Sequence, residues 1–272
     1  MGTFNTVITR VFDLILAPFS AHPWPGVVAV SLLTGFLLLL IFRYTSNQLG
    51  IRAAKDLIIS HLLEVLLYRD ELRVVMRAQA RLAKDNLRYL GHALVPLMFM
   101  IPPVLVLLVQ MDLRYSHRPL RVGEPTILAV KLRPGGPSPD QVSLSVPPGV
   151  AVETSALRMP AVGEVDWRLR AEAPGQHRLV IKVGKDEFEK WLVVGEPRGR
   201  VSPRRVGTGL WQQFLNPGEP PLPGDGPLAS VSVSYSGASL PLFGWRLHWI
   251  WLWLVLSMAF GYAVKGPLRV QV

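Results

Sequence analysis

Two long uncharged segments, separated by an arginine-rich stretch, constrain this chain most. Residues 27–42 and 94–111 carry no charged side chain. A membrane helix needs about 20 apolar residues to cross the hydrocarbon core. Trp24 as an interfacial anchor and Arg43 as a snorkelling end bring the first segment, 24–43, to that length. The stretch therefore predicts two membrane spans, 24–43 and 93–112, joined by a charged helical hairpin, 44–92.

Composition supports a membrane protein. Hydrophobic residues make up 50% of the 272 residues, and the mean hydropathy is +0.31, which is unusual for a soluble protein. The absence of cysteine excludes disulfides and thiolate metal sites. The net charge of +10 fits either nucleic acid or anionic lipid; we favour lipid and topology, because cytoplasmic Lys and Arg orient membrane proteins, and we expect no DNA partner.

The basic hairpin fixes the predicted sidedness. An excess of Lys and Arg in a short loop beside two spans places that loop in the cytoplasm and the N-terminus outside. Its arginines are read either as a solvated face or as contacts for anionic lipid or ribosomal RNA. The candidate contacts are Arg69, Arg73, Arg77, Arg81 and Arg88.

The hairpin should contain two antiparallel helices. One apolar stripe comprises Ile51, Leu57, Ile58, Leu62, Val65 and Leu66, and the other comprises Leu72, Val75, Met76, Leu82 and Leu87. Asp70 between them is a predicted N-cap. His61 is read as a surface or helix-packing residue.

The N-terminal segment, 1–23, predicts an amphipathic helix on the outer membrane surface. Apolar residues recur at helical spacing between Phe4 and Ile15, opposite Arg10 and Asp13. A secretory signal peptide is the alternative, but the basic n-region is missing and Asp13 interrupts the apolar run.

Three prolines lie inside the second predicted span. Pro96, Pro102 and Pro103 each remove a helical hydrogen bond, which is tolerated in a membrane only where neighbours or water satisfy the freed carbonyls. We therefore expect a kinked helix beside a wet cavity, with Gln110 and Asp112 marking its far interface.

The composition changes after Tyr115. Turn signals alternate with strand-like segments (TILAVKL, VSLSV, VDWRLR, HRLVIKV, KWLVV), which predicts an immunoglobulin-like all-β extracytoplasmic domain over 113–195. A Pro/Gly-rich loop with a further strand at 229–235 should follow over 196–242. A third span is expected at 243–264, with a cytoplasmic tail at 265–272. The predicted fold class is thus a three-span α-helical membrane protein with a cytoplasmic hairpin and an external β domain.

Catalytic motifs are not evident. The six histidines fall in different segments without metal-ligand spacing, and no phosphate loop, nucleophile elbow or paired-carboxylate motif occurs. We therefore expect neither an enzyme nor a cofactor or metal site.

The order of segments resembles the YidC-type insertase superfamily, which includes archaeal and eukaryotic three-span relatives. Local sequence is similar too: Asn86 to Gln110 (NLRYLGHALVPLMFMIPPVLVLLVQ) resembles the family's passage from the hairpin into a proline-containing span. The resemblance covers roughly residues 1–112 and 243–272. The inserted β domain departs from it, because bacterial members usually carry a large external domain before the core, or none.

The resemblance implies a hydrophilic groove, open to the cytoplasm and to lipid, that lowers the barrier for substrate entry into the bilayer. In the family this groove often carries an Arg from the first core span. Arg43 is the nearest match but lies at the end of its span, so it either snorkels or belongs to a shallower groove. The candidate groove residues are Arg43, Gln110, Pro96, Pro102 and Pro103.

The resemblance implies a non-enzymatic insertase or chaperone in the bacterial cytoplasmic (inner) membrane. Its expected partners are membrane lipids, nascent or partner membrane proteins and the ribosome. The alternative is a structural or assembly subunit that uses the core as an anchor and binds other subunits of a membrane complex through the β domain. A transporter component has little support, because charges within the spans are scarce.

Overall fold

The computed structural model describes residues 2–19, 22–67, 71–195, 200–242, 244–268 and 270. The chain forms two compact units. One comprises residues 1–26 and 107–249 and holds the β-sheets; the other comprises residues 27–106 and 250–272 and is helical. The expectation of helices plus a separate antiparallel β region is confirmed.

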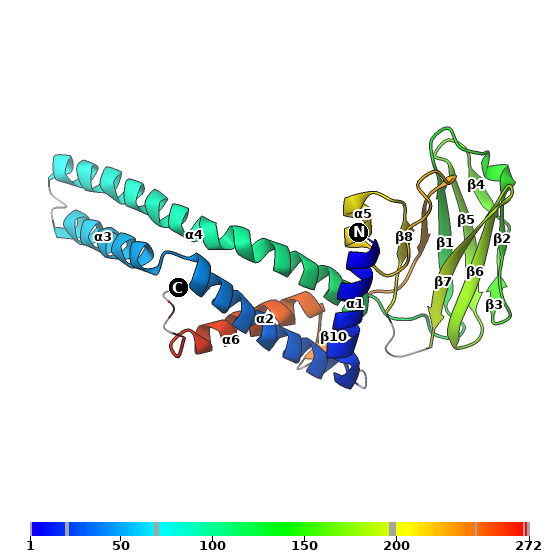
Figure 1. The fold of residues 1–272 in the computed structure, drawn as a ribbon, viewed down its shortest axis with the longest axis horizontal. Coiled ribbons are helices and arrows are strands. Elements are labelled where there is room, and N and C mark those ends of the chain that lie inside the picture. Colours follow the sequence, from blue (N-terminus) through cyan, green and yellow to red (C-terminus); the bar gives the residue numbers. More distant parts are fainter. Residues whose placement is uncertain are drawn as a thin grey trace. The chain divides into compact units, whose positions relative to one another are not determined.

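Apolar periodicity accounts for the helices. The helices are α1 (Gly2–Leu16), α2 (Pro23–Thr45), α3 (Gln48–Leu67), α4 (Leu72–Tyr115), α5 (Leu210–Leu215) and α6 (Trp249–Val264) (Figure 1). The first predicted helix and the first predicted span match α1 and α2. The predicted N-cap, Asp70, lies outside the described residues.

The second helix of the hairpin and the second predicted span form one continuous helix. Helix α4 runs without interruption over 44 residues, through all three prolines. At 1.5 Å per residue its length is about 66 Å, roughly twice the thickness of a hydrocarbon core. Proline can bend a helix, or remove one of its backbone hydrogen bonds, without ending it. One helix can therefore contain both the second hairpin helix and the second predicted span.

In the part of the chain that the structure describes, two helices are long and apolar enough to cross a membrane: α2 and the part of α4 from Val75 to Tyr115. The third predicted span is shorter than expected. Its first residue, Phe243, lies outside the described residues, and Trp245–Leu247 forms strand β11, which pairs with β10 (Leu240–Leu242). Helix α6 begins only at Trp249 and has 16 residues, about 24 Å.

Among the described residues, two antiparallel sheets form the β domain, and β10 and β11 form a separate two-stranded sheet. The larger sheet of the β domain has the order β3-β5-β1-β9-β8, with β4 beside β5, and the smaller has the order β2-β6-β7. The strands are β1 (Pro125–Leu132), β2 (Val142–Ser145), β3 (Val150–Val152), β4 (Leu157–Met159), β5 (Glu164–Ala171), β6 (Gly175–Val183), β7 (Asp186–Val194), β8 (Arg204–Val206) and β9 (Leu228–Val233). All five strand-like segments singled out in the sequence are strands.

The sheets share one hydrophobic core. Alternate residues of each strand point inward, as in β1, where Leu128, Val130 and Leu132 are buried between exposed neighbours. They pack in one cluster with Leu179 and Ile181 of β6. Strand β9, which was expected as an addition after residue 195, lies between β1 and β8 in the larger sheet.

Candidate functional site

Small side chains bring α2 and α6 into close contact within the helical unit. A Cβ atom added to Gly35 would lie 2.5 Å from the backbone oxygen of Ser257 and 3.2 Å from the nitrogen of Gly261. The Trp253 indole donates a hydrogen bond of 3.2 Å to Thr34 Oγ1, which itself donates to the Val30 carbonyl. Ser257 and Gly261 are thus small residues of α6 that lie against Gly35 of α2. Small residues at such positions allow membrane helices to pack closely.

Three backbone carbonyls of α4 lose their helical donors to proline. Pro96, Pro102 and Pro103 lie inside the helix, and proline has no N–H to donate to the carbonyl four residues earlier. The carbonyls concerned belong to His92, Met98 and Phe99. A carbonyl that stays unpaired in hydrocarbon costs several kcal/mol.

The same section of α4 exposes its apolar side chains. Only 12% of its most apolar window is buried, against 39% for α2. The exposed fraction is 72% for Met98 and 59% for Phe99. The side chains exposed in this way are Leu94, Val95, Leu97, Met98, Phe99, Ile101 and Leu105. We call this set the α4 apolar face; it lies over the stretch where helical hydrogen bonds are missing.

The predicted groove residues do not form one cluster. Arg43 is exposed in the last turn of α2, with its guanidinium 5.8 Å from the Tyr44 ring. Pro96 is buried, Pro103 half-buried and Pro102 exposed. Pro96, Pro103 and Gln110 recur every seven residues and so share one face of α4, although Gln110 belongs to the sheet-containing unit.

Both the amide nitrogen and the amide oxygen of the Gln110 side chain form hydrogen bonds. Its amide nitrogen donates to Thr9 Oγ1 at 3.1 Å, and its Oε1 accepts from Arg114 Nη1 at 2.9 Å. Arg114 Nη2 lies 2.6 Å from Asp13 Oδ1 and donates to the Thr9 carbonyl. This network ties α1 to the end of α4. The sequence analysis did not pair Asp13 with Arg114; an acid on the polar side of an amphipathic helix was the available signal.

Four of the five candidate hairpin arginines lie in the described part of the chain, and all four are exposed. Arg69 lies outside the described residues, whereas Arg73, Arg77, Arg81 and Arg88 project from α4 and are exposed. Arg81 lies 3.8 Å from Glu64 of α3, and Arg88 lies 3.8 Å from Asp85. Such loose surface pairs contribute at most about 1 kcal/mol each, which leaves the arginines accessible to lipid or RNA.

The contact between α3 and α4 is more polar than predicted. His61 Nδ1 lies 3.1 Å from Glu64 Oε2, and its Nε2 lies 3.3 Å from Asp85 Oδ2. His61 is therefore a helix-packing residue. In contrast, Leu62 and Leu66 of the predicted stripe are 52% and 71% exposed, so these apolar side chains face away from the contact.

A buried ion pair lies in the sheet-containing unit. Lys190 of β7 is completely buried, and its ammonium group binds the Glu219 carboxylate and donates to the Ser202 carbonyl at 2.6 Å. Burial lowers the pKa of Lys190, and the carboxylate of Glu219 opposes that change. No sequence signal pointed to this pair, since Lys190 lies in an ordinary strand pattern and Glu219 in a proline-rich loop.

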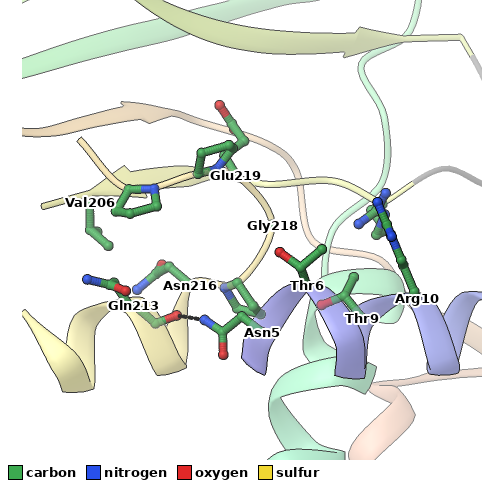
Figure 2. A pocket seen from close by; sticks show the side chains of 13 residues that line it. Asn5, Thr6, Thr9, Arg10, Val206, Gln213, Asn216, Gly218 and Glu219 are labelled. Carbon is green, nitrogen blue, oxygen red and sulfur yellow. Dashed lines mark hydrogen bonds between the residues drawn. The ribbon is translucent and has the colours of Figure 1, made fainter. Parts of the chain in front are cut away.

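A cavity of about 360 Å³ lies between α1 and the loop that follows α5 (Figure 2). The uncharged polar side chains that line it are Asn5, Thr6, Thr9, Gln213 and Asn216. Its charged lining residues are Arg10, Arg200 and Glu219. In the described ranges, no three histidine or acidic side chains lie close enough together to hold a metal ion.

The chain matches no known protein-family model, and no curated protein is significantly similar to it in sequence. The resemblance to YidC-type insertases therefore remains a prediction.

Proposed function

We propose that this protein is a YidC-like, non-enzymatic membrane protein insertase or chaperone. The observation that carries the proposal is the α4 apolar face, whose exposed side chains lie over the carbonyls freed by Pro102 and Pro103. An entering helix can pack on the side chains, and its polar groups can donate to the carbonyls. A charged residue at the centre of a membrane helix costs about 2.5–3.5 kcal/mol on insertion scales, and such donors and attracted water lower that barrier.

The lengths of the helices support a locally thin and hydrated bilayer. Helix α6 spans about 24 Å and the hydrocarbon core about 30 Å. A short apolar helix is accommodated by thinning of the bilayer around it. Because α6 contacts α2 at Gly35, thinning would occur beside the first span, and a thinner barrier favours the passage of polar substrate segments.

The proposed topology follows from the basic half of α4. Since the helix is about twice as long as the core is thick, its arginine-bearing N-terminal half must lie outside the hydrocarbon. Positive residues favour the cytoplasmic side, so the proposal places the hairpin and the C-terminus in the cytoplasm and the β domain outside, in a bacterial inner membrane. The exposed arginines would contact anionic lipid or the ribosome.

Site-specific photo-crosslinking tests this proposal. A crosslinker at Met98 should capture a nascent membrane protein during translation. The matched control is Leu33 of α2, which is also apolar and is 52% exposed. Adducts at Met98 but not at Leu33 support a substrate-binding face. Equal adducts at both positions indicate contact through lipid exposure alone and contradict the proposal.

The same experiment separates the insertase from an assembly subunit. An assembly subunit forms a stable stoichiometric complex without translation and loses it when residues 119–234, which contain β1 to β9, are replaced by a flexible linker. An insertase keeps its crosslinks at Met98 in that variant, because the α4 apolar face lies in the helical unit.

A further inference from the structure

The cavity between α1 and the loop after α5 carries an excess of positive charge. Arg10 and Arg200 line it. Arg200 Nε lies 3.6 Å from Asp13 Oδ2, and the same carboxylate binds Arg114. Two guanidinium groups thus share one carboxylate. Arg10, which also lines the cavity, makes no ion pair with any other residue that the structure describes.

The single acidic residue in the lining is already neutralised. Glu219 is only 5% exposed and binds the ammonium group of Lys190. Because Lys190 offsets its charge, Glu219 leaves the positive charge of Arg10 and Arg200 largely uncancelled. The remaining positive charge is available to a ligand.

Hydrogen-bond donors complement this charge. Asn5, Thr6, Thr9 and Arg10 project from one face of α1 (Figure 2), at the spacing of successive helical turns. Asn5 Nδ2 donates to the Gln213 carbonyl at 2.8 Å, which fixes α1 against α5 at one end of the cavity. Guanidinium groups beside amide and hydroxyl groups are the side chains that recognise phosphate oxygens.

The surroundings favour a phosphate at a membrane surface. Helix α1 exposes Phe4, Val7, Val11 and Leu14, and α5 exposes Leu210, Trp211 and Leu215. Apolar side chains of this kind insert into the headgroup region beside a polar helix face. The cavity volume is at the low end for ligand sites and suits a small polar group.

We propose that the cavity formed by Asn5, Arg10, Arg200 and Asn216 binds a phosphate group, with Arg10 and Arg200 as its cationic ligands. The phosphate belongs either to the headgroup of a phospholipid or to free inorganic phosphate. Binding would hold α1 at the membrane surface. The site is independent of whether the protein inserts other proteins.

Phosphorus NMR of the full chain in a phosphorus-free maltoside detergent tests the site. Inorganic phosphate is titrated in one arm and dihexanoyl phosphatidylglycerol in the other, with dissociation constants taken from the shift of the phosphate resonance. The Arg10→Gln variant removes a charge without breaking an ion pair. Arg158→Gln is the matched control, because it removes an exposed arginine that pairs with Asp140 in the β domain.

Loss of one charge-assisted hydrogen bond should weaken binding about tenfold or more in Arg10→Gln and leave Arg158→Gln unchanged. Saturable binding of the lipid alone identifies a headgroup site, and binding of both ligands in competition identifies a site for phosphate itself. Absence of saturable binding in both arms overturns the proposal. So does equal affinity in the wild type and Arg10→Gln.

Discussion

Replacing Lys190 with methionine should strongly destabilise the β domain. Methionine retains most of the side-chain volume, so the change removes the charge and leaves Glu219, which is 5% exposed, without its counterion. Removing one partner of a buried ion pair typically costs about 3–5 kcal/mol. The Ser202 carbonyl also loses the donor that bonds it at 2.6 Å.

Hydrogen exchange followed by mass spectrometry measures this effect in the intact protein. If β6 and β7 exchange through unfolding of the domain, a loss of about 3–5 kcal/mol speeds their exchange by about 10²-fold to several thousand-fold. The control is Lys182→Met on β6, whose pair with Glu187 is 49% and 59% exposed and contributes at most about 1 kcal/mol.

A second variant isolates the uncompensated charge. Adding Glu219→Gln to Lys190→Met removes the buried anion, so the double variant should recover much of the lost protection. Equal exchange in the Lys190→Met and Lys182→Met variants would show that the pair is not buried as described and would refute the reasoning.

Three further predictions concern other contacts. Gly35→Leu should lower the thermal stability of the helical unit in detergent, because a Cβ there meets Ser257 O at 2.5 Å, whereas Gly91→Leu, with nothing within 4 Å, should not. Asp85→Asn should speed hydrogen exchange in α3 by loosening His61, and the exposed Asp56→Asn should leave it unchanged. Arg118 holds the pKa of Glu124 at about 2, below its usual 4.5, so their pair stabilises the β domain above pH 4.5 and loses that contribution as the pH falls to 2. Acid unfolding of Glu124→Gln should lack this component, worth about 1 kcal/mol after solvent screening.

Local patterns predicted most of the secondary structure. The five strand-like segments all became strands, because alternation of apolar residues reports burial on one face of a sheet. The helices α1 and α2 followed from apolar periodicity and from length. Strand β9 was expected as an addition, but its central place beside β1 depends on long-range pairing that short patterns do not encode.

The start of the last helix was predicted less well. The prolines of α4 were expected to kink the helix, and α4 continues through them to Tyr115. The third span was expected from residue 243, but Trp245–Leu247 pairs with β10 and helix α6 begins at Trp249. Strand pairing, which apolar composition does not report, decides where this helix begins.

The polar contacts of the candidate sites were the hardest to predict. Asp13 and Arg114 are separated by 101 residues, and Lys190 and Glu219 by 29. Nothing in the spacing of these residues identifies a partner, because each pair forms only when distant segments fold together. The candidate groove residues were identified by family resemblance, and the structure shows instead the exposed apolar face on α4.

Insertion by the purified protein is the most direct test of the proposed function. The protein is reconstituted into liposomes, and the fraction of a newly synthesised single-span substrate that becomes protected from protease is measured. We predict several-fold more protection than with empty liposomes, and a smaller gain when Pro102→Ala and Pro103→Ala together restore the hydrogen bonds to the Met98 and Phe99 carbonyls. Equal protection with the wild-type protein and with empty liposomes would contradict the proposal.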